Sequence, residues 1–151
     1  MDEILSYYRD SLQVNELNQW LGGKDGKILH LGRLAGSSPA VIAACLLGDG
    51  KNHVFILPDK ESAAYFHNDL FNFSGREDIL FFPSSYKRSV QYTQKSADNV
   101  VQRTGVFKKL SQQKSGQIII SFPEALVEKN VSGNFLDDNA FSINKGDKLS
   151  L

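Results

Sequence analysis

The sequence has little of several features that would each indicate a particular class of protein. Among its 151 residues there is one cysteine, Cys45, so no internal disulfide can form. No apolar run reaches the roughly 20 residues that a membrane-spanning helix needs, so no membrane partner is expected. The acidic, amphipathic start MDEILSYYRD lacks the pattern of a secretory signal. Together these absences predict a cytoplasmic protein in which Cys45 is a buried small hydrophobe.

Neither sign of charge is in excess, since 17 lysines and arginines balance 17 aspartates and glutamates. No overall field therefore draws the chain to nucleic acid or to anionic lipid, although local basic patches can still form. The three histidines, His30, His53 and His67, lie near three different predicted elements and lack the spacing of metal ligands. We expect no metal site and no cofactor.

What the sequence does contain is an alternation of apolar runs and helical patterns. The predicted strands are KILHLG (27–32), HVFILP (53–58), DILFFP (78–83), QIIISF (117–122) and FSIN (141–144). The predicted helices cover about 2–20, 39–47, 60–73, 99–112 and 124–129. Continuous apolar strands that alternate with helices predict an α/β fold, with an open, mainly parallel sheet and helices on both faces.

The length fits one domain with a real core. Within it we predict an N-terminal helical segment over residues 1–22, which Gly22 and Gly23 end. An α/β subdomain follows over 23–140, and residues 141–151 begin a connection to a further subdomain. The longest predicted loop, 84–97, is where function would be sought first.

The stretch LGRLAGSSPAV (31–41) stands between a predicted strand and a predicted helix, where a nucleotide-binding protein carries its phosphate loop. A working loop reads G-x-x-x-x-G-K-[ST], in which the lysine offsets phosphate charge and the hydroxyl holds magnesium. With Gly36 as the anchor of the alignment, Arg33 and Ser38 replace the two glycines, Pro39 the lysine and Ala40 the hydroxyl residue. The loop has the position of a phosphate loop without its chemistry, so no catalytic residue is assigned.

The same residues have a structural role that explains them better. Ser38 is a good N-cap, and Pro39 suits the first turn of a helix. The amides of Gly36, Ser37 and Ser38 would still point out of a helix start, which leaves a weak anion site as an alternative.

Two carboxylates follow predicted strands, where they could hold magnesium. Asp59 also reads as a helix N-cap, and Ser121-Phe122-Pro123-Glu124 matches the S-x-x-E capping box. Capping is the interpretation we prefer for both. The serines Ser84, Ser85 and Ser121 lack a nucleophile-elbow pattern such as G-x-S-x-G, which disfavours an independent hydrolase.

The loop FPSSYKRSVQY mixes basic and aromatic side chains, namely Tyr86, Lys87, Arg88 and Tyr92. Such a mixture can track a nucleic-acid backbone and stack on bases, or contact a protein partner. It is also common in an ordinary solvated loop. We therefore note these residues as a possible nucleic-acid or partner contact.

In order along the chain, five stretches resemble the UvrB-like N-terminal module of bacterial transcription-repair coupling factors (Mfd). They are LGRLAGSSPAVIAA, VFILPDKESAAYFHNDL, ILFFPSSYKRSVQY, NVVQRTGVFKKL and QIIISFPEALVEK, and they cover about residues 28–130. The first resembles the phosphate loop of UvrB with its chemistry removed, which implies a degenerate P-loop, helicase-like fold of the UvrB domain 1a type. The segment after FFPSSY is too short for the DNA-clamping hairpin of UvrB, so clamping of that kind is not expected.

The resemblance implies a function as part of a larger protein. Members of this family are ATP-driven DNA translocases that displace stalled RNA polymerase and recruit UvrA for nucleotide excision repair on double-stranded DNA. Their UvrB-like module is non-catalytic, so this chain would be a scaffold that contacts the following subdomains within the same bacterial, cytoplasmic protein. The alternatives are a small stand-alone nucleotide-binding enzyme and a nucleic-acid-binding module.

Overall fold

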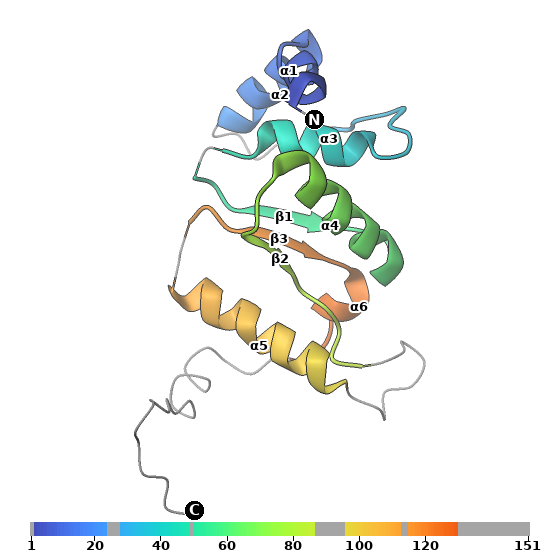
Figure 1. Ribbon diagram of the computed structural model, residues 1–151, viewed down its shortest axis with the longest axis vertical. Helices are drawn as coiled ribbons and strands as arrows, with labels where there is room; N and C mark the ends of the chain where they lie inside the picture. Colours follow the sequence, from blue (N-terminus) through green and yellow to red (C-terminus); the bar gives the residue numbers. More distant parts are fainter. Residues whose placement is uncertain (1, 24–27, 49, 87–95, 113–114, 130–151) are drawn as a thin grey trace, which may run out of the picture.

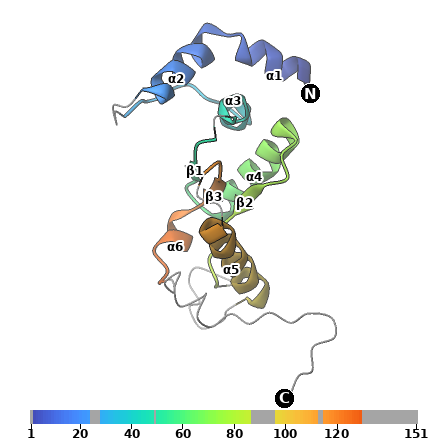
Figure 2. The same cartoon turned by 90° about the vertical axis from the view of Figure 1, so that its left-hand side faces the viewer.

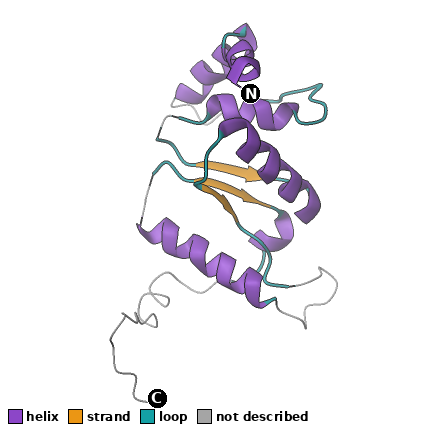
Figure 3. Ribbon diagram, viewed as in Figure 1, coloured by secondary structure: helices purple, strands orange, loops and turns teal. Residues whose placement is uncertain are grey.

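The computed structural model describes residues 2–23, 28–48, 50–86, 96–112 and 115–129. Within these residues the chain is an α/β protein built on a three-stranded parallel sheet (Figures 1 and 3). The strands are β1 (His53–Ile56), β2 (Ile79–Phe81) and β3 (Ile118–Ser121), and their order in the sheet is β1-β3-β2. The predicted α/β class with a parallel sheet is confirmed, whereas the P-loop, UvrB-like type of fold stays a prediction.

The helices lie close to where the sequence predicts them. They are α1 (Asp2–Arg9), α2 (Leu12–Gly22), α3 (Ser38–Leu46), α4 (Lys60–Ser74), α5 (Ala97–Gln112) and α6 (Pro123–Leu126). The prediction of a single helix over 2–20 is wrong, because the helix is interrupted at Ser11. The Ser11 side chain accepts a hydrogen bond from the Val14 amide and so starts α2. Helix α4 ends at Gly75, whose φ of 65° is a left-handed conformation that glycine adopts without strain.

Helices cover the sheet on both faces (Figures 1 and 2). The connection from β1 through α4 to β2 crosses the sheet in one direction, and the connection from β2 through α5 to β3 crosses back. Because such crossovers are right-handed, α4 and α5 must lie on opposite faces. Ring contacts agree with this: Phe55 of β1 meets Phe66 of α4, and Phe82 after β2 meets Phe107 of α5.

The core is centred on β3, the middle strand. Ile118 and Ile120 are almost fully buried, as are Leu70 of α4 and Ala125 of α6. Burying one such leucine or isoleucine contributes about 1.5–3 kcal/mol, which explains why the middle strand is the most apolar run. The edge strand β1 differs, because its residues alternate between half-buried and exposed. Cys45 is buried, as predicted.

The predicted strand at 27–32 is wrong for this structure. Residues 28–35 run as irregular chain outside the sheet, and residues 28–32 are exposed. An apolar run indicates that side chains prefer burial, but a strand also needs a neighbour to bond with, and here the run pairs with no other strand. The predicted strand FSIN and the connection at 141–151 lie outside the described residues, and the division into segments at 22 and 140 stays a prediction.

No helix among the described residues combines the length and the apolar character that crossing a membrane requires.

Candidate functional site

The residues that the sequence singles out lie after strands, at the carboxyl edge of the sheet. In open parallel sheets this edge is where ligands bind. Asp59 follows β1, Ser84 and Ser85 follow β2, and Glu124 follows β3. Figure 1 shows α3 and α4 both starting on the side of the sheet where the strand arrows end. The loop that resembles a phosphate loop leads into α3.

This loop is built as a helix start. Helix α3 begins at Ser38, one residue earlier than predicted, so the N-cap is Ser37 and not Ser38, and Ser37 makes no side-chain cap bond. The Ser38 hydroxyl instead accepts a hydrogen bond from the Ala35 amide at 2.9 Å, and the Ser38 amide donates to the Ala35 carbonyl at 3.1 Å. Pro39 lies in the first helical turn, as predicted.

The loop closes as a tight turn on itself. Gly36 has a φ of 56°, and a Cβ added there would meet no atom within 4 Å, so its glycine serves the turn and not a close approach. Because the Ser38 amide is used inside this turn, it does not point outward as the anion-site alternative requires. That alternative keeps only Gly36 and Ser37, both of which are exposed.

Asp59 caps helix α4, as predicted. Its carboxylate accepts a hydrogen bond from the Ser62 amide at 2.7 Å. Hydrogen bonds from Ser62, first from its amide and then from its side chain, lower the pKa of Asp59. The carboxylate is thereby engaged in a local cap, which is the interpretation preferred from the sequence.

The predicted capping box at Ser121-Glu124 is wrong. The N-cap of α6 is Phe122, which has no side-chain acceptor. Ser121 is the last residue of β3 and is fully buried, and its hydroxyl donates to the Phe82 carbonyl at 3.0 Å. Cross-strand bonding in the sheet therefore outcompetes the local cap. Glu124 is exposed.

Sequence reasoning missed a buried polar cluster at this edge, formed by Ser84, Ser85, Arg103 and Glu128. The Arg103 guanidinium donates to the carbonyls of Pro83 at 2.5 Å and Ala125 at 3.0 Å. The same nitrogen lies 3.6 Å from a carboxylate oxygen of Glu128. The guanidinium carbon also sits 4.1 Å from the centre of the Phe82 ring, a cation–π geometry.

Glu128 completes the cluster from the other side. Its carboxylate accepts bonds from the Ser85 amide at 2.9 Å and the Ser84 hydroxyl at 3.2 Å, and a further bond from the Ser85 hydroxyl. Burial by itself raises the pKa of Glu128, but the serine hydrogen bonds and the charge of Arg103 together outweigh it and lower that pKa. Burial lowers the pKa of Arg103, and Glu128 opposes this shift.

We call the cluster of Ser84, Ser85, Arg103 and Glu128 the clasp, because its contacts are those of a structural element. Arg103 and Ser85 are almost completely buried, at 5% and 4% exposure, so a substrate cannot reach the Ser85 hydroxyl. A carboxylate whose pKa is lowered is also a weaker general base at neutral pH, which does not favour Glu128 as an activator of that hydroxyl. The clasp joins α5, the segment after β2 and the end of α6.

The clasp also fixes the base of the loop that carries the basic and aromatic residues. The Ser96 amide donates to the Ser85 carbonyl at 2.8 Å, and the Asn99 side chain donates to the Ser84 carbonyl at 2.8 Å. Tyr86 is half-buried at the start of this loop. Lys87, Arg88 and Tyr92 lie outside the described residues.

The histidines are spread over the fold. His53 stacks on Phe55, His67 meets the ring of Phe81 edge-on, and His30 is exposed. Across the part of the chain that the structure describes, no three His, Cys, Asp or Glu side chains gather as a metal site would require.

No known protein family, curated protein or solved structure matches this chain. The likeness to transcription-repair coupling factors thus stays a prediction from the sequence.

Proposed function

We propose that the chain is a non-catalytic scaffold, the first subdomain of the UvrB-like module of a bacterial transcription-repair coupling factor. The five ordered stretches of sequence resemblance support this proposal. The parent protein would be a cytoplasmic, ATP-driven DNA translocase that displaces stalled RNA polymerase and recruits UvrA. This chain would contribute intramolecular contacts with the subdomains that follow it.

The observation that carries the proposal is the build of the loop before α3. Pro39 stands where a phosphate loop has its lysine, and it is fixed inside the first turn of the helix. The Ser38 hydroxyl, one residue before it, is turned back onto the Ala35 amide. Pro39 cannot neutralise phosphate charge, and Ala40 stands where the magnesium-binding hydroxyl residue would be, so the loop supports a scaffold and not an ATPase.

The other groups at the carboxyl edge support the same proposal. Asp59 is used as a cap, and Glu128 is used to hold Ser84 and Ser85. These two carboxylates therefore already stabilise the local structure. The clasp ties the segment after β2 to α5 and to Glu128 through hydrogen bonds, which suits a scaffold.

Capture of purified UvrA tests the proposal. By the family resemblance, UvrA docks on the subdomain that follows this one, so immobilised residues 1–151 should retain no UvrA. A longer form of the parent protein, extended by about 80–100 residues, should retain it. Equal retention by both forms would show that the docking surface has been misplaced, and failure of both would contradict the assignment to this family.

A further inference from the structure

Residues 28–34, which we call the strap, are incompletely packed in this structure. They carry four aliphatic side chains, and Ile28 is 85% and Leu31 50% exposed. Cavities lie on both sides of the strap. One of about 330 Å³ is lined by the strap, α3, α4 and the run from Val54 to Leu57, and one of about 700 Å³ is lined by the strap, α3 and the segment that contains α1 and α2. Aliphatic side chains between two hollows have not reached the packing density typical of a protein interior.

The neighbouring edge of the sheet also lacks a partner. Strand β1 pairs only with β3 in the described structure, and its Val54 and Ile56 side chains are 57% and 58% exposed. His53 and Leu57 donate their amides to the β3 side. Because parallel strands alternate, the amides of Val54 and Ile56 point to the free edge. The run His53–Leu57 contains no lysine or proline, the residues that usually protect an exposed edge.

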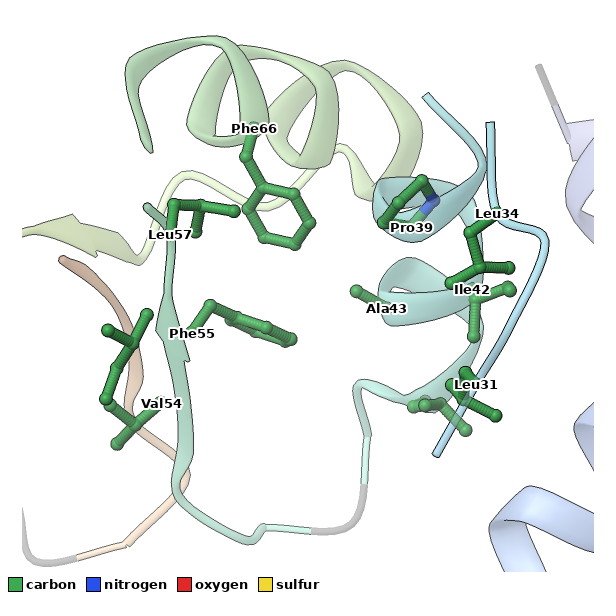
Figure 4. A pocket seen from close by; sticks show the side chains of 11 residues that line it. Leu31, Leu34, Pro39, Ile42, Ala43, Val54, Phe55, Leu57 and Phe66 are labelled. Atoms are coloured by element: carbon green, nitrogen blue, oxygen red, sulfur yellow. The ribbon is translucent and has the colours of Figure 1, made fainter. Parts of the chain in front are cut away.

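Figure 4 shows the hollow between β1 and α3, which Leu31 and Leu34 of the strap also line from beside α3. Leu31 and Leu34 lie on one side of it, with Ile42 of α3, and Phe55 of β1 and Leu57 directly after β1 lie on the other. The cavity is lined by apolar side chains from both parts. Closing the strap onto β1 would fill this space with the aliphatic groups that are now exposed.

Both ends of the strap are already placed for such a closure. The Lys51 ammonium donates to the Leu21 carbonyl at 3.2 Å, which ties the end of α2 to the loop that enters β1. Helix α3 starts at the opposite side, where the strands end (Figure 1). If residues 28–32 form the added strand, residues 23–27 connect it to α2 and residues 33–37 connect it to α3. Each connection has five residues, within the usual range of about two to six.

Handedness decides which edge the strap would join. Helix α4 connects β1 to β2, and α3 lies on the same side of the sheet as α4 and packs on it (Figures 1 and 2). A right-handed crossover through α3 must move in the same direction as the one through α4. A strand that precedes α3 therefore belongs on the far side of β1 from β3, which is the free edge.

We propose that the strap exchanges between the open position of this structure and a closed position along β1. In the closed position residues 28–32 run parallel to β1 and form backbone hydrogen bonds with its free edge. Leu29 and Leu31 then lie in the cavity beneath α3. The strap then governs access to an apolar strand edge, because a strand from another protein could bind β1 only when the strap is open.

Disulfide trapping in the full 151-residue chain tests this. In the closed position His30 lies on the same face as Val54 and Ile56, and neighbouring strands are about 4.8 Å apart, within disulfide reach. We would prepare the variants His30→Cys/Val54→Cys and His30→Cys/Ile56→Cys, which cover the two possible registers. All three positions are exposed or edge positions in the open structure, so the fold should tolerate the changes.

The matched control is His30→Cys/Tyr65→Cys, because Tyr65 is exposed on α4 and is not part of β1, the edge that the closed strap would join. Native Cys45 is buried, and burial raises the pKa of its thiol, so it should oxidise slowly in every variant. We expect at least one edge pair to form an intramolecular disulfide about tenfold faster than the control pair, as for a locally populated contact. Equal rates for all pairs, or linkage only between two molecules, would overturn the proposal.

Discussion

Replacing Arg103 by methionine is the most informative test of the clasp. Methionine keeps much of the aliphatic volume of arginine but removes every donor. The carbonyls of Pro83 and Ala125 would lose their bonds to the guanidinium, and Glu128 would lose its cation. The stacking of the guanidinium on Phe82 would also be lost.

The expected cost follows from the burial of this pair. Removing one partner of a buried ion pair costs about 3–5 kcal/mol, because the other charge stays uncompensated. Glu128 keeps its bonds from Ser84 and Ser85 and is itself 13% exposed, which favours the lower end of that range. We therefore expect Arg103→Met to lower the free energy of unfolding by about 3 kcal/mol, a large share of the 5–15 kcal/mol typical of a domain.

Urea unfolding followed by far-UV circular dichroism measures this change. The chain offers a matched control in Arg76, whose pair with Asp78 is exposed, at 35% and 53%. Arg76→Met should cost less than about 1 kcal/mol. The double variant Arg103→Met/Glu128→Gln should lose about 1 kcal/mol less stability than the sum of the losses of the two single variants. An Arg103→Met variant as stable as Arg76→Met would refute the reasoning.

Three further predictions concern acid stability, a helix end and DNA. The pKa of Glu128 in the folded state is below its unfolded value of 4.5, so its contribution to the free energy of unfolding is present above pH 4.5 and is lost as the pH falls below it. In that acid range the free energy of unfolding of Glu128→Gln should therefore depend less on pH than that of the wild type. Gly75→Ala, at a φ of 65°, should cost about 1 kcal/mol in thermal unfolding, whereas Gly22→Ala, within α2 and with open space around it, should stabilise the chain or leave it unchanged. Duplex DNA should bind weakly, with an affinity that falls steeply as salt rises; tight, salt-resistant binding abolished by Tyr86→Ala would instead indicate a DNA clamp.

The sequence predicted most of the elements because their signals are local. The buried strands are short, continuous apolar runs, and Asp59 stands directly before a helical pattern whose first turn it caps. Such signals do not depend on which segments meet in space. The α/β class follows from their alternation alone.

Several of the failures depend on which segments distant in the sequence meet in space. Ser121 matched a local cap but bonds to Phe82, directly after β2 and 39 positions away. Arg103 looks like any charged residue of a helix, and its burial depends on carbonyls 20 and 22 positions away. The run at 27–32 is apolar enough for a strand, yet in this structure no neighbouring strand pairs with it.

Calorimetric titration of residues 1–151 with ATP and magnesium tests the central claim most directly. With Pro39 in the lysine position and the Ser38 hydroxyl bound within the loop, we expect no saturable heat of binding and no hydrolysis. A Pro39→Lys variant should not restore turnover, because it also removes the proline that favours the helix start. A magnesium-dependent site with a micromolar dissociation constant would contradict the scaffold assignment.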